Sequence, residues 1–186
     1  MIEKGVEVTF KPNWINKNII NSDNFNKIMY FFVVRTPAKN VSSQGYKFSS
    51  PEWENYKLTS SELREYMLGV ANLKRDENFF VIHHVDDFKD VPKTVNLGKD
   101  FNKHLSEKVA IYVSNNKSIL ESLFYHIRCA LAHGRFAIKV KNGETYYLFE
   151  SVKSSKVDDK YYLRSRMVLK ESTLIKWIDV IFTGEI

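Results

Sequence analysis

The sequence predicts a mainly helical α+β fold, in which a helical core carries a small antiparallel sheet. Five segments place apolar residues at helical spacing, and one Asn-Gly pair separates two β-rich runs. The 186 residues, 44% of them hydrophobic, are enough for one domain with its own core. We expect a single domain over residues 1–186, with a loop-rich stretch at 39–58 and a β-hairpin insertion at about 136–169.

The five predicted helices are recognised by their apolar stripes and by residues that commonly cap helices. The stripes span residues 25–33, 63–70, 101–112, 120–131 and 174–181. For the first four, the candidate N-caps are Ser22 or Asp23, Thr59 or Ser60, Asp100, and Asn115 or Asn116. Pro37 ends the first helix, because proline disfavours the helical conformation in the residue before it.

The predicted strands follow the fourth helix. The run FAIKVKNGETYYLFE, residues 136–150, has Asn-Gly between two strand-like halves, which indicates a hairpin with a tight turn. Residues 161–169 are expected to add a third strand, and residues 78–85 and the VEVTF segment are weaker strand candidates. On the third strand, alternation places Tyr162, Arg164 and Arg166 on one face, suited to holding phosphates and stacking a base. The other face is expected to pack into the core through Leu163, Met167 and Leu169.

The net charge of +6 favours a polyanionic partner such as nucleic acid, although a basic surface can also serve solubility alone. We expect no membrane-spanning segment, because no run of about 18 apolar residues exists. Cys129 is the only cysteine, so no disulfide can form within the chain. The N-terminus does not have the pattern of a secretory signal, and a cytoplasmic location is expected.

The fourth predicted helix carries Arg128 and His133 near its end at Gly134. A guanidinium binds two phosphate oxygens at once, and a histidine transfers protons near neutral pH. Such a pair can cleave RNA by activating a ribose 2′-hydroxyl, without a metal or cofactor. Two structural alternatives stay open: His133 can satisfy the last helix carbonyls, and Arg128 can pair with Glu121.

The other side of this helix, apart from Tyr125, carries small and mildly polar residues. These are Ser118, Ser122, Cys129 and Ala132. Small side chains let another helix approach closely, and a two-fold dimer uses the same surface on both copies. We therefore expect a homodimer through this helix, which would bring two copies of Arg128 and His133 together.

The string IRCALAHGRF, residues 127–136, resembles the signature of HEPN domains, in which Arg, a polar residue and three further residues precede His. The resemblance implies a helical bundle that dimerises with the two motifs facing each other. It also implies a metal-independent ribonuclease, often a toxin or antiviral effector, with Arg128 and His133 as the catalytic pair. Cys129 departs from the usual Asn, Asp or His at the position after the arginine.

The sequence thus predicts a HEPN-type endoribonuclease that acts on RNA as a dimer, with an antitoxin or another regulatory protein as a further expected partner. The alternatives are an inactive RNA-binding or protein-interaction module of the same fold and a plain dimerisation module. Besides the catalytic pair, the residues expected to contact RNA are Tyr125, His126, Cys129, Arg135, Arg164 and Arg166.

Overall fold

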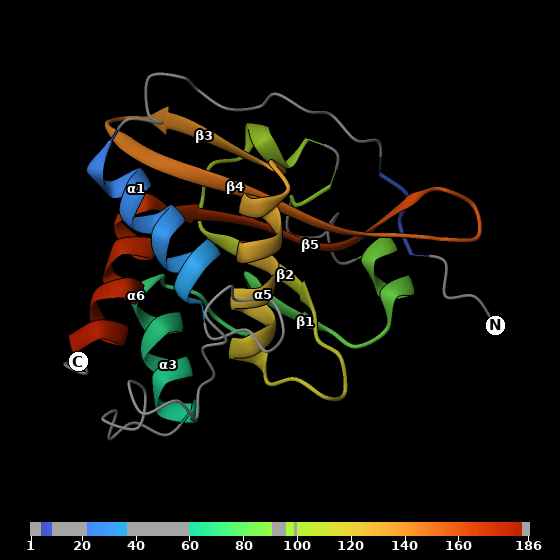
Figure 1. Ribbon diagram of the computed structural model, residues 1–186, viewed down its shortest axis with the longest axis horizontal. Coiled ribbons are helices and arrows are strands. Elements are labelled where there is room, and N and C mark those ends of the chain that lie inside the picture. Colours follow the sequence, from blue (N-terminus) through green and yellow to red (C-terminus); the bar gives the residue numbers. More distant parts are fainter. Residues whose placement is uncertain (1–4, 9–21, 37–59, 91–95, 99, 184–186) are drawn as a thin grey trace.

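The computed structural model describes residues 5–8, 22–36, 60–90, 96–98 and 100–183, and shows an α+β fold built on a five-stranded mixed sheet (Figure 1). The strand order is β1-β2-β5-β4-β3, in which β1 and β2 are parallel and the other neighbours antiparallel. The strands are β1 (Phe79–Ile82), β2 (Lys108–Tyr112), β3 (Phe136–Lys141), β4 (Glu144–Ser154) and β5 (Tyr161–Lys170). The α-helices are α1 (Asp23–Met29), α3 (Ser60–Val70), α5 (Ile119–Ala132) and α6 (Glu171–Thr183). Shorter helical turns are η1 (Tyr30–Arg35), η2 (Val85–Lys89) and η3 (Phe101–Lys103).

The prediction of a HEPN-like helical bundle with a small attached sheet is therefore wrong. The three strands that follow α5 do not form an appendage, since β5 lies at the centre of the sheet between β2 and β4. The helix predicted over residues 101–112 is also wrong: this segment is the 3-10 turn η3 followed by strand β2. A strand buried on both faces is apolar at nearly every position, so chance matches to helical spacing occur.

Most of the local predictions are confirmed. Helix α1 begins at the Ser22 cap, α3 begins at Ser60, and α6 covers the last predicted stripe. The N-cap of α5 is Ser118, a few residues after the predicted start. The β3–β4 turn consists of Asn142 and Gly143, whose φ angles of 52° and 79° are those that the predicted hairpin turn requires. The predicted loop at 39–58 lies outside the described residues.

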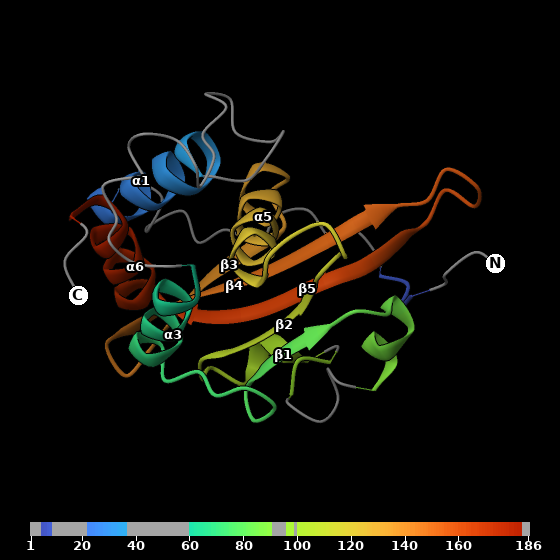
Figure 2. The same ribbon diagram turned by 90° about the horizontal axis from the view of Figure 1, so that it is seen from below.

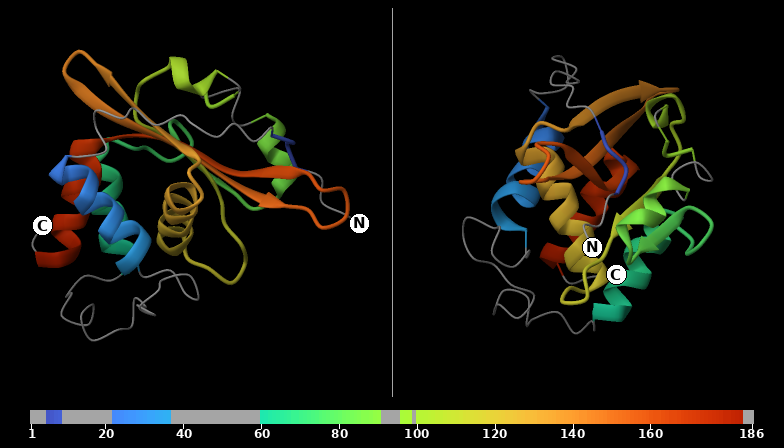
Figure 3. Two further views of the ribbon diagram at one scale, coloured as in Figure 1. Left: turned by 45° about the horizontal axis from the view of Figure 1, so that its top comes forward. Right: turned by 90° about the vertical axis from the view of Figure 1, so that its right-hand side faces the viewer.

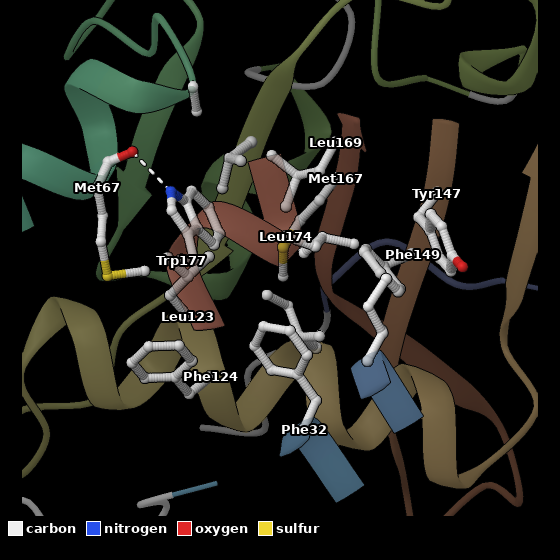
Figure 4. Packing of buried hydrophobic residues seen from close by; sticks show 14 of the residues in the cluster. Phe32, Met67, Leu123, Phe124, Tyr147, Phe149, Met167, Leu169, Leu174 and Trp177 are labelled. Atoms are coloured by element: carbon white, nitrogen blue, oxygen red, sulfur yellow. Dashed lines mark hydrogen bonds between the residues drawn. The ribbon is translucent and has the colours of Figure 1, made fainter. Parts of the chain in front are cut away.

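One face of the sheet is covered by helices, as Figures 2 and 3 show. Side chains from α1, α3, α5 and α6 pack with the sheet into one hydrophobic cluster, whose centre includes Phe32, Phe124, Met167 and Trp177 (Figure 4). The Trp177 indole N–H donates a 2.8 Å hydrogen bond to the Met67 carbonyl, so that its polar atom is satisfied within the core. This bond ties α6 to α3.

The opposite face is also buried, beneath η2, η3 and the segment around Leu97 (Figure 3). Phe88, Leu97 and Phe101 form a second cluster with strand residues that include Leu148 and Val168. Strands β4 and β5 therefore contribute to two cores.

Strand β5 does not have the simple alternation that the sequence suggested. The pairing of β4 with β5 shifts between Ser151 and Val152, where Ser151 faces Ser165 and Val152 faces Leu163. This irregularity leaves Arg164 as an extra residue on β5. As a result, Leu163 joins the second cluster while Met167 and Leu169 belong to the first, so the predicted common core face is wrong.

Candidate functional site at helix α5

Both ends of α5 are defined by side-chain and backbone caps. At the start, the Ser118 hydroxyl accepts a hydrogen bond from the Glu121 N–H, and the Glu121 carboxylate accepts one from the Ser118 N–H, at 3.2 and 2.8 Å. At the end, the Arg135 N–H donates to the Ala130 carbonyl and the Gly134 N–H to the Leu131 carbonyl. This is the Schellman arrangement, and the φ of +64° at Gly134 is the left-handed value that it requires.

Most of α5 is buried within its own chain. The predicted apolar stripe, Leu120 to Leu131, lies in the first hydrophobic cluster. The small-residue side is buried in part: Ser122 is 1% exposed and Cys129 is 8% exposed, whereas Ser118 and Ala132 are exposed. Ser122 and Cys129 are therefore not free to meet a second copy.

The exposed surface of α5 is a narrow line of residues that we call the outward stripe: Glu121, Tyr125, Arg128 and Ala132, followed by His133 at the helix end. Their spacing of three or four residues places the first four on one side of the helix. Arg128 is half-buried, and its Nε atom is buried with no hydrogen-bond partner among the described residues. His133 is exposed, and its backbone N–H, rather than its ring, bonds to the last turn.

Neither structural alternative for this pair is seen in the described part of the chain. The Glu121 carboxylate belongs to the capping box and not to Arg128. No carbonyl of the last turn accepts a bond from the His133 ring. Five helical residues correspond to a rotation of about 140° and a rise of about 7.5 Å, so within one chain the two groups point in different directions.

Arg135 and Arg166, two of the predicted RNA contacts, are buried around Glu150. The guanidinium of Arg135 pairs with one oxygen of the Glu150 carboxylate, and Arg166 binds the other oxygen at 2.8 and 2.9 Å. Arg166 also donates to the Leu97 carbonyl and lies over the Phe101 ring. Since each arginine is only 7% exposed, their expected place on an RNA-binding surface is wrong. Glu150 was the missed signal, an acid that directly follows the apolar run Tyr146–Phe149 in β4.

His126, another predicted RNA contact, is also buried. Its Nε2 lies 2.8 Å from the Tyr112 carbonyl and its Nδ1 lies 3.1 Å from the Ser151 hydroxyl. Because a carbonyl can only accept, Nε2 carries the proton and Nδ1 accepts from Ser151. Burial lowers the pKa of His126 from 6.5 to about 4, and the charges of Lys117 and Arg164 act in the same direction. This histidine is therefore neutral at physiological pH.

Beside His126, the structure forms a cavity that the sequence did not indicate. It lies between the first half of α5, the loop before it, and the ends of β4 and β5. Its walls include Tyr125 and Arg164, which the sequence predicted as RNA contacts, and Lys117, which it did not single out. The sequence did not indicate this cavity, because regular strand alternation would separate Arg164 from the other lining residues. The irregular pairing of β4 and β5 brings them together.

No protein-family model, curated protein or solved structure matches this chain in comparisons with known proteins. Within the described ranges, no helix has the length and apolar character needed to cross a membrane. The same residues contain no group of three or more His, Cys, Asp or Glu side chains placed to hold a metal ion.

Proposed function

We propose that this protein is a metal-independent endoribonuclease in which Arg128 binds the scissile phosphate and His133 transfers the proton. The observation that carries the proposal is the state of the two side chains at the end of α5. Both belong to the outward stripe, and neither is used by the structural interactions that otherwise explain them. The resemblance of residues 127–134 to the HEPN signature and the charge of +6 support the same function.

The proposed reaction needs only these two groups and the RNA itself. His133 removes the proton of a ribose 2′-hydroxyl, and the resulting oxyanion attacks the adjacent phosphorus. The bond from phosphorus to the 5′-oxygen breaks, and that oxygen takes up a proton. The products are a 2′,3′-cyclic phosphate and a 5′-hydroxyl end. Arg128 is permanently charged and stabilises the negative charge that builds up on the phosphate.

The proposed enzyme is a homodimer, because the Arg128 and His133 of one chain diverge around the helix. A second copy meeting the outward stripe would place the arginine of one chain beside the histidine of the other. This contact surface shares Ala132 with the small-residue side that the sequence suggested, but it does not include the buried Ser122 and Cys129. A cytoplasmic location, where RNA and a regulatory partner such as an antitoxin are available, belongs to the same proposal, as does a role as a toxin or antiviral effector.

A non-catalytic RNA-binding or protein-interaction module is the second candidate function, and Cys129 favours it. Its side chain is 8% exposed and lies beneath the outward stripe. A thiol is also only a weak hydrogen-bond donor. The residue after the arginine therefore offers little help to chemistry at the helix surface.

The test is RNA cleavage by the purified protein in excess chelator, with His133→Ala and Arg128→Ala as variants. His83→Ala and Arg75→Ala are matched controls at exposed positions. We expect each motif variant to lose about 100-fold or more in rate, as is typical for loss of a general acid or base, and the controls to stay unchanged. Equal cleavage by wild type and His133→Ala would contradict the proposal. Binding of intact RNA by a wild type that never cleaves it would favour the second candidate.

A further inference from the structure

The cavity beside His126 has the size of a small-molecule site. Its volume is about 430 Å³, within the range of about 300–1,000 Å³ of typical ligand pockets. It lies on the side of α5 where the β4–β5 hairpin extends beyond the helices (Figure 2). Tyr125 lines the cavity and also belongs to the outward stripe.

All charged side chains that line the cavity are positive. Lys117, Lys153 and Arg164 contribute three positive charges, and no aspartate or glutamate is among the lining residues. The Nζ of Lys117 lies 3.7 Å from the centre of the Tyr125 ring, and the guanidinium of Arg164 lies 5.6 Å from that of Tyr112. The face of Tyr125 holds the Lys117 cation in place without neutralising it. The cavity therefore favours an anionic ligand.

We propose that this cavity is a nucleotide-binding site, in which Lys117, Lys153 and Arg164 hold the phosphate. Three cations suit the several oxygens of a phosphate group. The volume leaves room for a sugar and a base, which the tyrosine walls can contact. The ligand is either a free mononucleotide or the phosphorylated end of an oligonucleotide. The site is separate from Arg128 and His133 and does not depend on the proposed nuclease activity.

The test is calorimetric titration of the full chain with four probes: inorganic phosphate, a nucleoside 5′-monophosphate, the unphosphorylated nucleoside, and a 5′-phosphorylated oligoribonucleotide. We expect the monophosphate to bind with a Kd below about 1 mM and the nucleoside to bind at least about tenfold more weakly. If the phosphorylated oligonucleotide binds more tightly than the monophosphate, the occupant is an RNA end, and the reverse order assigns a free nucleotide. Equal binding of nucleoside and nucleotide, or no binding of either, would overturn the proposal.

Substitutions of the lining lysines test whether the nucleotide binds in the cavity. Lys117→Met and Lys153→Met should each weaken monophosphate binding about tenfold, whereas Lys141→Met, on the exposed end of β3, should leave it unchanged. Thermal melting of each variant separates loss of binding from loss of folding. Wild-type affinity in both cavity variants would overturn the proposal. Because His133→Ala should bind the nucleotide normally, failure of the nuclease proposal and failure of this one are distinguishable.

Discussion

At the residue scale, the fold contains two buried polar centres, and each provides partners for its buried polar atoms in a different way. His126 stays neutral and uses both ring nitrogens in hydrogen bonds. Glu150 stays charged and is matched by the guanidinium groups of Arg135 and Arg166. Burial of an unpaired polar group or charge is costly. A change in the charge of either centre should therefore lower the stability of the fold strongly.

The His126 imidazole should make folding stability fall as the pH falls. Its pKa is about 4 in the folded protein against 6.5 ordinarily, so between these values the unfolded chain binds a proton that the folded chain does not. The loss approaches about 1.4 kcal/mol per pH unit, or about 3 kcal/mol in all. Urea unfolding from pH 7 to pH 4 measures it. His126→Gln, which does not titrate, should lack this component, and exposed His133→Gln should keep it. Parallel pH curves for His126→Gln and wild type would contradict the assignment.

Removal of the Glu150 carboxylate should be strongly destabilising. Glu150→Gln leaves two arginines buried beside a neutral group, and breaking a buried ion pair in this way typically costs about 3–5 kcal/mol. Glu144→Gln is the matched control on the same strand, since its pair with Lys170 is exposed to solvent and should contribute far less than the buried cluster. The free energy of unfolding in urea is the measurement. Similar small losses in both variants would show that the buried cluster does not stabilise the fold.

These two centres also show what residue patterns could not predict. Arg135 and Arg166 were expected at the surface because arginine usually is. The pairing of β4 with β5 brings Arg166 onto Glu150, and the pairing of β3 with β4 brings Arg135 there. The prediction for Arg128 and His133 depended on helix spacing and on the resemblance of residues 127–136 to the HEPN signature, both of which are local. Their positions near the end of α5 could therefore be anticipated from the sequence, whereas the half-burial of Arg128 could not.

At the scale of elements, α5 is defined by signals that lie within a few residues of each other. Ser118 and Glu121 cap its start, and Gly134 allows the left-handed turn at its end. Helices α1, α3 and α6 were predicted for the same reason, since caps and apolar spacing are local. Strand β2 was missed because its environment is not local: its neighbours β1 and β5 lie some 30 and 60 residues away in sequence.

The capping box predicts a measurable stability difference at the start of α5. Ser118→Ala removes the hydroxyl that accepts from the Glu121 N–H and should cost about 1 kcal/mol. Ser118→Asp keeps an acceptor at the cap and should stay within a few tenths of a kcal/mol of wild type. Thermal unfolding followed by circular dichroism compares the two. A loss as large in Ser118→Asp as in Ser118→Ala would show that the cap is not the cause.

At the scale of the whole molecule, the sheet divides the protein into a helical layer and a thinner layer of 3-10 turns (Figure 3). The sequence revealed most of these elements but not their arrangement. A count of helices suggests a bundle, whereas burial of β4 and β5 on both faces makes the sheet the centre. The arrangement matters for function, because it buries Ser122 and Cys129 of α5 and leaves the outward stripe as its exposed surface.

The proposed two-chain site predicts complementation between two inactive proteins. Arg128→Ala and His133→Ala should each be inactive alone, but a mixed dimer contains one site with an intact arginine from one chain and an intact histidine from the other. After unfolding and refolding an equal mixture, half of the dimers are mixed, so about a quarter of the wild-type activity should return. Cleavage of RNA measures the recovery, and sedimentation confirms that the variants are dimers. A mixture that stays inactive while dimeric would place both groups in one chain and contradict the shared site.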